Sequence, residues 1–380
     1  MKKSLLWIVV MVLSVSMVAA FSFAGCKAEE AAAAEEEVAV VEEEVAEESA
    51  EEAVVEETAE ESSTIEIPDQ IMKNIDGKTY KFAVSLGWVE NESGRRLKSG
   101  FEEAFAFFGD EAVFSDASYD AKKQIEQIEA FIKMKPDALF VTPSDTLAIT
   151  PVVRSAIEAG IPVFCADSLV ANTGVITTAF SNNFGMGVYS GEYVALRLGG
   201  KGQIAIIDLP SNETWDMRAL GLYWILQKYP GIEIVAKWSY DTTGVVAPRQ
   251  AADNMLAANP DPGSIDAVWS AWDGGAMEAA LAIKTAGREN EIFTTGIDGG
   301  EQVFEYIASD TPMALCMAQS FWEMSNTIVY YAHEYLGGRY APRIIVTPVY
   351  AVTKERLEKG IRDDYDKPGV REELGWERDL

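Results

Sequence analysis

Short apolar runs alternate with helix-like segments from residue 80 to about residue 309, and this alternation constrains the fold more than any other feature. The apolar runs have the length of buried strands, and the segments between them have apolar residues at helical spacing. The expected strands are residues 80–86, 112–114, 138–142, 162–166, 203–208, 232–237, 267–269, 292–295 and 313–317. The expected helices are residues 95–108, 121–133, 147–159, 185–197, 215–228, 248–258, 276–286 and 301–309. Such alternation predicts parallel sheets covered by helices on both faces, arranged in two α/β lobes of similar layout.

One unit of this alternation, residues 265–286, suggests where a ligand lies. Its strand ends in the corner Trp272-Asp273-Gly274-Gly275, after which a helix follows. In open parallel sheets, ligands bind beyond the carboxyl ends of the strands. An aromatic ring beside a carboxylate suits a polyhydroxylated molecule, because the ring covers C–H faces and the carboxylate accepts hydroxyl hydrogens. Alternatively, Asp273 caps the helix and Trp272 packs in the core.

Two further carboxylates, Asp167 and Asp298, also follow apolar strands. Because the carboxyl ends of parallel strands meet at one edge of a sheet, these side chains and Asp273 are expected to converge on one crevice. A helix-capping role is again the alternative for Asp298.

Composition limits the partners of the chain. Its 380 residues are 48% hydrophobic, enough for two domains with their own cores. The net charge is −30 and there is no basic stripe, so nucleic acid is not an expected partner.

The first 26 residues have the order of a secretory signal: Lys2 and Lys3, an apolar stretch, and small residues before Cys26. The ending Ala24-Gly25-Cys26 resembles the lipobox of bacterial lipoproteins, in which the cysteine carries lipid. The prediction is an exported protein attached to the membrane through this lipid only, in the periplasm or on the outer face of the cytoplasmic membrane. An uncleaved membrane helix is the alternative.

Residues 27–64 are almost entirely Ala, Glu and Val, with sixteen glutamates and one lysine. So many like charges with so little apolar surface predict a disordered tether. Helical spacing of Val38, Val41 and Val45 leaves a stalk or coiled coil as the alternative. The folded body is expected over residues 65–380, and no role is predicted for its end, residues 354–380.

Signatures of catalysis and of cofactor binding are missing from the sequence. It contains no G-x-G-x-x-G after the first strand, no P-loop, no H-E-x-x-H, no C-x-x-C and no G-x-S-x-G. No metal site and no cofactor are therefore expected, and the single His333 is interpreted as structural. Cys165 and Cys316 lie in apolar runs and are expected to be buried free thiols.

Several short segments resemble the periplasmic sugar-binding proteins of ABC transporters, of the ribose- and galactose-binding type that shares its fold with the ligand domains of LacI repressors. These segments are residues 82–87 (FAVSLG), 97–101 (LKSGF), 136–143 (PDALFVTP), 159–163 (AGIPV), 181–183 (SNN) and 295–299 (TGIDG). Their order and spacing extend the resemblance over residues 80 to about 353.

The resemblance implies two Rossmann-like, doubly wound lobes joined by a hinge of three chain crossings, with a ligand in the cleft between them. The crossings are expected near residues 180–183, 318–320 and 344–347. The first lobe would be residues 78–180 plus 320–343, and the second lobe 183–318 plus 347–380.

Family positions that bind the ligand can be carried over residue by residue. They place Asn91, Asp167, the Trp272-Asp273 corner, Asp298 and Gln319 in the cleft. An arginine of ribose-type members is replaced here by Ser168, another by Asp216, and two aromatic residues by Ser93 and Gly94. Trp88, Trp215 and Trp272 are expected to supply the missing aromatic faces, so the ligand is expected to differ from ribose. The predicted ligand-binding residues are Trp88, Asn91, Asp167, Trp215, Asp216, Trp272, Asp273, Asp298 and Gln319.

The function predicted from the sequence is capture of a small sugar or polyol by a monomeric lipoprotein that delivers it to an ABC permease, without catalysis. Binding of an amino sugar or of a sugar-derived signal for chemoreception is one alternative, because several carboxylates lack a matching arginine. A lipid-anchored hydrolase that uses paired aspartates is the alternative from another class.

Overall fold

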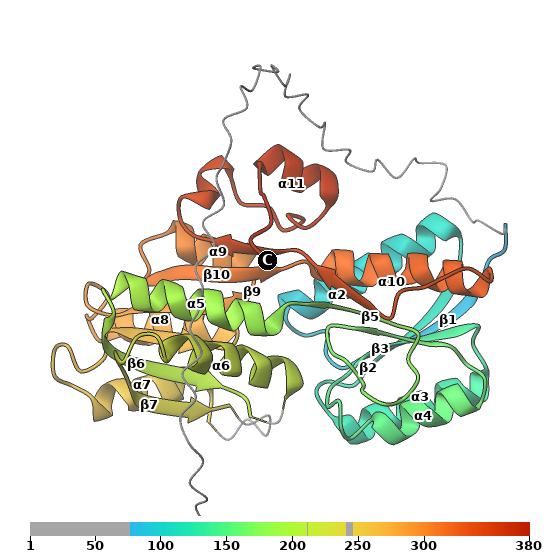
Figure 1. Ribbon diagram of the computed structural model, residues 1–380, viewed down its shortest axis with the longest axis horizontal. Helices are drawn as coiled ribbons and strands as arrows, with labels where there is room; N and C mark the ends of the chain where they lie inside the picture. Colours follow the sequence, from blue (N-terminus) through green and yellow to red (C-terminus); the bar gives the residue numbers. More distant parts are fainter. Residues whose placement is uncertain (1–76, 211, 241–245) are drawn as a thin grey trace, which may run out of the picture. The chain divides into compact units, whose positions relative to one another are not determined.

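The computed structural model describes residues 77–210, 212–240 and 246–380 (Figure 1). The predicted signal peptide, Cys26 and the predicted tether lie outside these residues. Within the described ranges, no helix has both the length and the apolar character needed to cross a membrane.

The first lobe contains a six-stranded sheet in which all neighbouring strands are parallel, in the order β11-β5-β4-β3-β1-β2. Helices α2 and α10 pack on one face through the cluster around Phe101 and Ile328, and α3 and α4 pack on the other around Ile128 and Val153. The strands are β1 (Lys81–Leu86), β2 (Glu111–Asp116), β3 (Ala138–Thr142), β4 (Val163–Ala166), β5 (Thr177–Ser181) and β11 (Ile344–Thr347). The helices are α2 (Glu92–Phe108), α3 (Ala121–Met134), α4 (Thr150–Glu158) and α10 (Phe321–Leu336).

The second lobe repeats this layout with the order β12-β10-β9-β8-β6-β7, in which only the β10–β12 pair is antiparallel. Helices α5 and α6 cover one face, and α7, α8 and α9 cover the other. The strands are β6 (Lys201–Asp208), β7 (Gly231–Ser239), β8 (Ala267–Ser270), β9 (Phe293–Asp298), β10 (Met313–Gln319) and β12 (Val349–Val352). The helices are α5 (Asn183–Arg197), α6 (Glu213–Leu226), α7 (Pro248–Ala258), α8 (Asp273–Thr285), α9 (Glu301–Ala308), the 3₁₀ helix η1 (Arg356–Lys359) and α11 (Pro368–Leu374).

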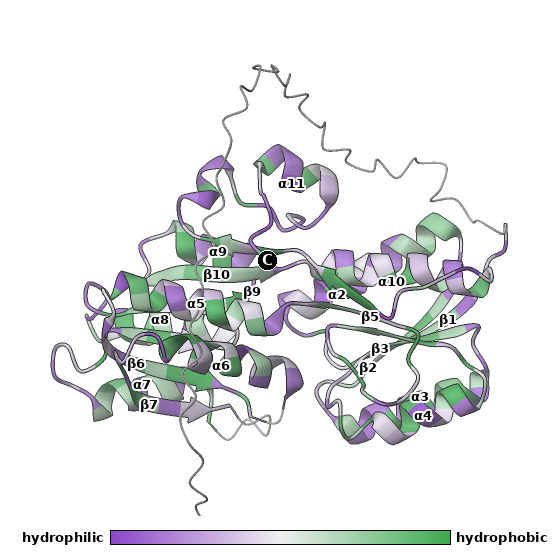
Figure 2. Cartoon of the chain, in the orientation of Figure 1, coloured by the Kyte–Doolittle hydropathy of each residue, from purple (hydrophilic) through white to green (hydrophobic). Residues whose placement is uncertain are grey.

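Both lobes have the alternation that the sequence predicts, and the α/β fold class is confirmed. Helices such as α3 and α4 carry hydrophobic and hydrophilic residues along their length (Figure 2), because one side packs on a sheet and the other faces solvent.

The chain passes between the two sheets three times, after β5, after β10 and at Pro348 between β11 and β12. Hydrogen bonds tie these crossings together. The Ser181 and Thr347 hydroxyls lie 3.3 Å apart, and the Ser320 hydroxyl donates to the Pro348 carbonyl at 2.8 Å. Residues 344–347, where the sequence placed the last crossing, form β11 in the first sheet, and the crossing follows them directly.

Three buried residues that could have been reactive are structural. His333 Nε2 lies 2.7 Å from Asp110 Oδ2, and its ring stacks on Phe108 at 4.0 Å. Cys165 and Cys316 are buried free thiols, as predicted. Burial raises the pKa of Cys165 to about 12, so its thiol stays protonated and unreactive at neutral pH.

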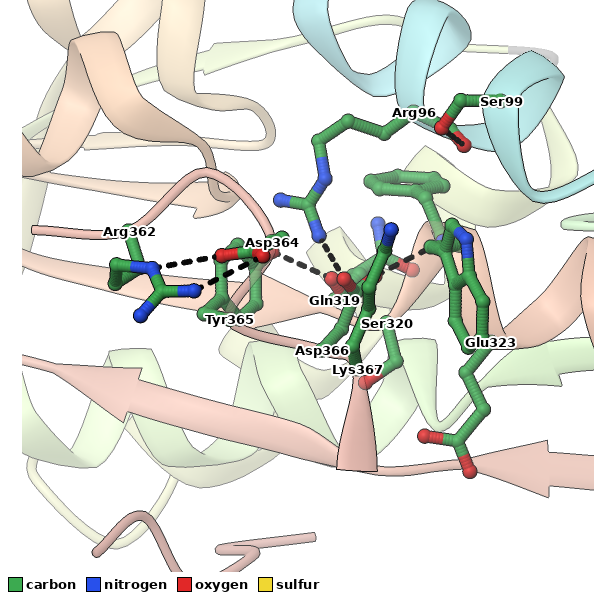
Figure 3. Close-up of polar contacts among 12 residues, drawn as sticks. Arg96, Ser99, Gln319, Ser320, Glu323, Arg362, Asp364, Tyr365, Asp366 and Lys367 are labelled. Carbon is green, nitrogen blue, oxygen red and sulfur yellow. Dashed lines mark hydrogen bonds and ion pairs between the residues drawn. The ribbon is translucent and has the colours of Figure 1, made fainter. Parts of the chain in front are cut away.

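The C-terminal segment, for which the sequence predicted no role, contacts both lobes (Figure 3). Tyr365 packs in the core of the second lobe beside Phe304, with ring centroids 5.1 Å apart. The next residue, Asp366, pairs with Arg96 of α2 in the first lobe at 2.5 Å, and its Oδ2 accepts the Trp322 amide hydrogen at 2.9 Å. Burial alone would lower the pKa of Arg96, but Tyr365 and Asp366 outweigh it and raise that pKa above its ordinary value.

Candidate functional site

A cavity of about 480 Å³ is lined by side chains from both lobes. The first lobe contributes residues that follow β1, β2 and β4, and the second lobe contributes residues that follow or end β6, β7, β8 and β9. This is the carboxyl edge of both sheets, the place where the chain order predicts a ligand. Six of the nine predicted site residues line the cavity: Trp88, Asn91, Asp167, Trp215, Trp272 and Asp298.

Asp298 ends β9 and is held by two partners. Arg218 Nη1 lies 2.9 Å from its Oδ1, and Gln319 Nε2 donates to the same oxygen at 2.7 Å. Burial raises the pKa of Asp298, although the Arg218 charge and the hydrogen bonds oppose the rise. Gln319 is fully buried behind Asp298, so the residue that the sequence placed on the ligand orients a carboxylate that lines the cavity.

Asp167 follows β4 and is 3% exposed. Its amide donates to the Ala179 carbonyl at 2.8 Å, and the Ser168 hydroxyl donates to its Oδ2 at 3.1 Å. Burial raises its pKa to about 6, and the Arg218 charge opposes this rise. The backbone of Asp167 has φ 72° and that of Asp298 has φ 122°, conformations that cost energy for residues with a Cβ. Such strain concentrates at functional sites.

Asp273 lies just outside the cavity lining, at the first residue of α8. Its Oδ1 accepts the Gly274 amide hydrogen at 2.7 Å and its Oδ2 accepts the Gly299 amide hydrogen at 3.1 Å. The carboxylate therefore connects the start of α8 to the loop after β9, next to Asp298. Burial and the Asp298 charge raise the pKa of Asp273 well above its ordinary value.

Asp216 is a correction to the sequence interpretation. It is exposed on the first turn of α6 and does not line the cavity. Arg218, two residues later, is 2% exposed and does line it. Because successive helical residues point about 100° apart, the turn that directs Asp216 outward directs Arg218 inward. The expectation that the cleft lacks an arginine at this helix was wrong.

Aromatic rings from both lobes form two stacked pairs in the cavity wall. Trp88 stacks on Tyr119 with centroids 5.5 Å apart and planes at 7°. Trp215 stacks on Trp272 with centroids 4.5 Å apart and planes at 21°, and Tyr240 lies 5.4 Å from Trp272. Each lobe thus presents flat apolar faces together with polar groups.

The cavity residues that the sequence interpretation missed include Tyr119, Tyr240 and Arg218. Tyr119 and Tyr240 follow β2 and β7 closely, so the strand-end rule that identified the aspartates would have found them. Arg218 lies inside a helix and had no such signal. Among the described residues, no group of three or more His, Cys, Asp or Glu side chains is arranged to hold a metal ion.

Comparison with known proteins agrees with this geometry. The periplasmic binding protein domain family matches residues 82–339. The ribose import binding protein of Bacillus subtilis is 27% identical over 282 residues, which is 73% of this chain and 88% of that protein. A putative rhizopine-binding protein of Rhizobium meliloti is 30% identical over 237 residues, 59% of this chain and 74% of that protein.

A solved structure of an ABC transporter solute binding protein from Bacillus halodurans, with bound myo-inositol, superposes with a TM-score of 0.68 at 26% identity. It covers 75% of this chain and 98% of the solved chain. These findings confirm the resemblance seen in the sequence: the chain belongs to the periplasmic binding protein domain family.

Proposed function

We propose that this protein captures a small sugar or polyol in the cleft between its lobes and delivers it to an ABC permease. The observation that carries the proposal is the cavity at the carboxyl edges of both sheets, where aromatic pairs and carboxylates from different lobes face one enclosed volume. A polyhydroxylated ring needs both: flat faces for its C–H groups and acceptors for its hydroxyls.

Each lobe has a distinct part in binding. In the first lobe, Trp88 and Tyr119 cover one face of the solute, while Asn91 and Asp167 bond its hydroxyls. In the second lobe, Trp215 and Trp272 cover the other face, and Asp298 accepts hydroxyl hydrogens while Arg218 orients it. Hydrogen bonds to charged groups are stronger than neutral ones once the cleft closes and excludes water.

The relatives support this solute class. Apart from the ribose import protein, they include a D-apiose import binding protein of Actinobacillus succinogenes and a xylitol-binding protein of Mycolicibacterium smegmatis. Sugars and linear polyols share hydroxyl groups on a small carbon skeleton, which is the feature that this cavity fits. Membership of a solute-binding family also favours binding over hydrolysis by paired aspartates.

A contact between the lobes supports closure over the solute. Glu92 begins α2 in the first lobe, and its carboxylate accepts the Glu301 amide hydrogen at 2.5 Å and the Gln302 amide hydrogen at 3.4 Å. Helix α9 has no side-chain cap of its own, so Glu92 supplies one from the other lobe. This bond breaks when the lobes separate, and it therefore favours the closed state.

The proposal includes export and lipid attachment. Residues 1–26 would act as the signal peptide, Cys26 as the lipid site and residues 27–64 as a spacer that carries a monomeric body at the membrane surface. The sequence order of basic residues, apolar stretch, small residues and cysteine supports this. Cys26→Ala should release the protein from membranes or leave it as an unprocessed precursor. Fractionation and mass measurement test this, and unchanged membrane association with unchanged processing would refute lipid attachment.

The function itself is tested with the purified protein and a panel of sugars and polyols. Isothermal titration should give saturable binding with one site per chain, and bound solute should raise the melting temperature. Incubation with glycosides should give no turnover. Turnover that is lost in Asp167→Asn and Asp298→Asn would instead support the hydrolase.

A further inference from the structure

The charges around the cavity are unbalanced, which bears on the kind of solute that fits. Asp167 and Asp298 are both at least nine-tenths buried and line the cavity, with Asp273 directly behind Asp298. The buried cation among them is Arg218, whose Nε donates to Asn183 Oδ1 at 2.9 Å and whose Nη1 donates to the Ala271 carbonyl at 2.7 Å. Its ion pair is with Asp298, so within residues 77–210, 212–240 and 246–380 Asp167 has a serine hydroxyl but no paired cation.

Other charged groups do not remove this excess. Arg249 also lines the cavity, but its Nε lies 3.3 Å from Asp253 on its own helix and its Nη2 donates to Thr285 Oγ1. Glu278 lines the cavity too and adds negative charge. Glu213 acts on Asp167, and Glu92 acts on Asp273, with the same sign. The cavity therefore has an excess of negative charge.

Asp167, Asp273 and Asp298 all act on one residue of the cavity wall. Their charges all act on the hydroxyl of Tyr119, whose pKa is raised mainly by burial and then by Asp298, Tyr240, Asp167 and Asp273. The rings of Trp88 and Tyr240 stand beside it. Carboxylates combined with aromatic faces are the usual surroundings of an organic cation in proteins.

We infer that the solute of this cleft is a polyhydroxylated molecule that carries a protonated amine, and that the ammonium group lies beside Asp167. This inference rests on the proposed function, because it concerns the same cavity. A neutral solute can donate hydroxyl hydrogen bonds to Asp167 but leaves its buried charge without a counter charge. An ammonium group supplies the charge and three hydrogen-bond donors.

The two kinds of solute differ in how strongly their affinity depends on pH. The pKa of Asp167 in the unliganded protein is about 6. An ammonium beside it favours the carboxylate and lowers that pKa in the complex, so affinity is full above pH 6 and weakens as the pH falls. A neutral solute supplies hydroxyl hydrogen bonds but no counter charge, so it shifts that pKa less and its affinity changes less between pH 7 and pH 5.

The test uses matched pairs in isothermal titration between pH 5 and pH 7: D-glucosamine with D-glucose, D-galactosamine with D-galactose, D-mannosamine with D-mannose, and 1-amino-1-deoxy-D-glucitol with D-glucitol. At pH 7, at least one amine should bind about tenfold or more tightly than its neutral partner, and its affinity should fall severalfold at pH 5. A neutral member of each pair that binds as tightly as its amine at pH 7 would overturn the inference and leave the proposed function standing. If no amine binds, the inference fails, and if neither class binds, the proposed function fails too.

Two variants assign the effect to one residue. Asp167→Asn keeps the size of the side chain and removes its charge, so it should weaken amine binding about thirtyfold, leave the neutral partner within about threefold, and remove the pH dependence. Asp216→Asn makes the same chemical change on the exposed side of α6 and should change neither affinity by more than about twofold. Equal losses for the amine and its neutral partner in Asp167→Asn would count against the ammonium position. If Asp167→Asn does not fold, the affinities of the unmodified protein for amine and neutral solutes at pH 7 and pH 5 still test the inference.

Discussion

Two buried arginine–aspartate pairs in this protein have similar chemistry and different surroundings. Arg218 and Asp298, 2.9 Å apart, line the cavity between the lobes together with Asp167, which forms no ion pair with any other described residue. Arg96 and Asp366, 2.5 Å apart, lie behind the hinge, where Asp366 is 0% exposed. The first pair is part of a site that has excess negative charge and open space. The second is a one-to-one pair covered by the ring of Tyr365, whose centroid is 4.0 Å from the Arg96 guanidinium carbon.

The difference suggests separate roles for two ion pairs of the same type. We expect the Arg218–Asp298 pair to serve binding and the Arg96–Asp366 pair to serve stability. At the cavity, the carboxylates can gain from a solute because their interactions are incomplete. Behind the hinge, both oxygens of Asp366 are occupied, one by Arg96 and the other by the Trp322 amide hydrogen. Replacing Asp298 should therefore mainly lower solute affinity, whereas replacing Asp366 should mainly lower stability.

The largest expected effect is on the second pair. Asp366→Asn leaves the Arg96 charge buried without a counter charge, so it should lower the free energy of unfolding by about 3–5 kcal/mol. Chemical denaturation measures this. Asp364→Asn is the matched control, because Asp364 pairs with Arg362 at the surface, with side chains 30% and 42% exposed. It should cost about 0–1 kcal/mol. Similar losses in both variants would show that the Arg96 pair is not specially important.

Asp298→Asn should affect the first pair differently. It weakens the charge-assisted bonds to the solute and should lower affinity about tenfold to a hundredfold, equivalent to about 1.5–3 kcal/mol. The loss of unfolding free energy should be smaller than in Asp366→Asn, because Arg218 keeps Asn183 and the Ala271 carbonyl as partners. If stability falls as far as in Asp366→Asn while affinity is kept, the two pairs do not differ in role.

A pair of tryptophans separated by two residues sharpens the contrast between site and core. Trp272 is half-buried in the cavity wall, whereas Trp269 is 0% exposed and donates to the Ser190 hydroxyl at 2.9 Å. Trp272→Ala should lower solute affinity about tenfold or more. Trp269→Ala should instead lower the free energy of unfolding by about 3–5 kcal/mol. Titration and thermal melting separate these outcomes, and apo destabilisation with preserved affinity in Trp272→Ala would place that ring in the core.

The smallest effect is expected at the contact between the lobes. Glu92→Gln keeps the side-chain shape but weakens the cap on α9, which destabilises the closed state. Solute affinity should fall by about 0.5–1 kcal/mol as a result. Glu102→Gln on the exposed face of the same helix is the control, since Glu102 pairs at the surface with Lys98 of that helix. Titration at low salt measures the solute affinity of both variants. Equal affinities would show that Glu92 does not contribute to closure.

The sequence predicted best the features that depend on local pattern. The strand over residues 138–142 was placed at its observed bounds because it is a fully buried apolar run between turn residues. Asp167 and Asp298 were found because parallel strands bring their ends together. Neither inference needed knowledge of distant contacts.

What the sequence did not predict depends on long-range packing. Strand β12 has four residues and is identified by its antiparallel pairing with β10, which no local pattern shows. The Arg96–Asp366 pair joins residues far apart in the chain, so the role of the C-terminal segment was not visible. Asp216 was predicted because family members have an arginine at its position, and the sequence does not show that Arg218, two residues later, faces the cavity.

The most direct measurement is a crystal structure of residues 65–380 with a solute from the titration panel. The account predicts that the solute lies between the Trp88–Tyr119 pair and the Trp215–Trp272 pair, with hydroxyl or amine groups within hydrogen-bond distance of Asp167 and Asp298. A solute bound outside this cavity, or one that contacts neither aspartate, would contradict it.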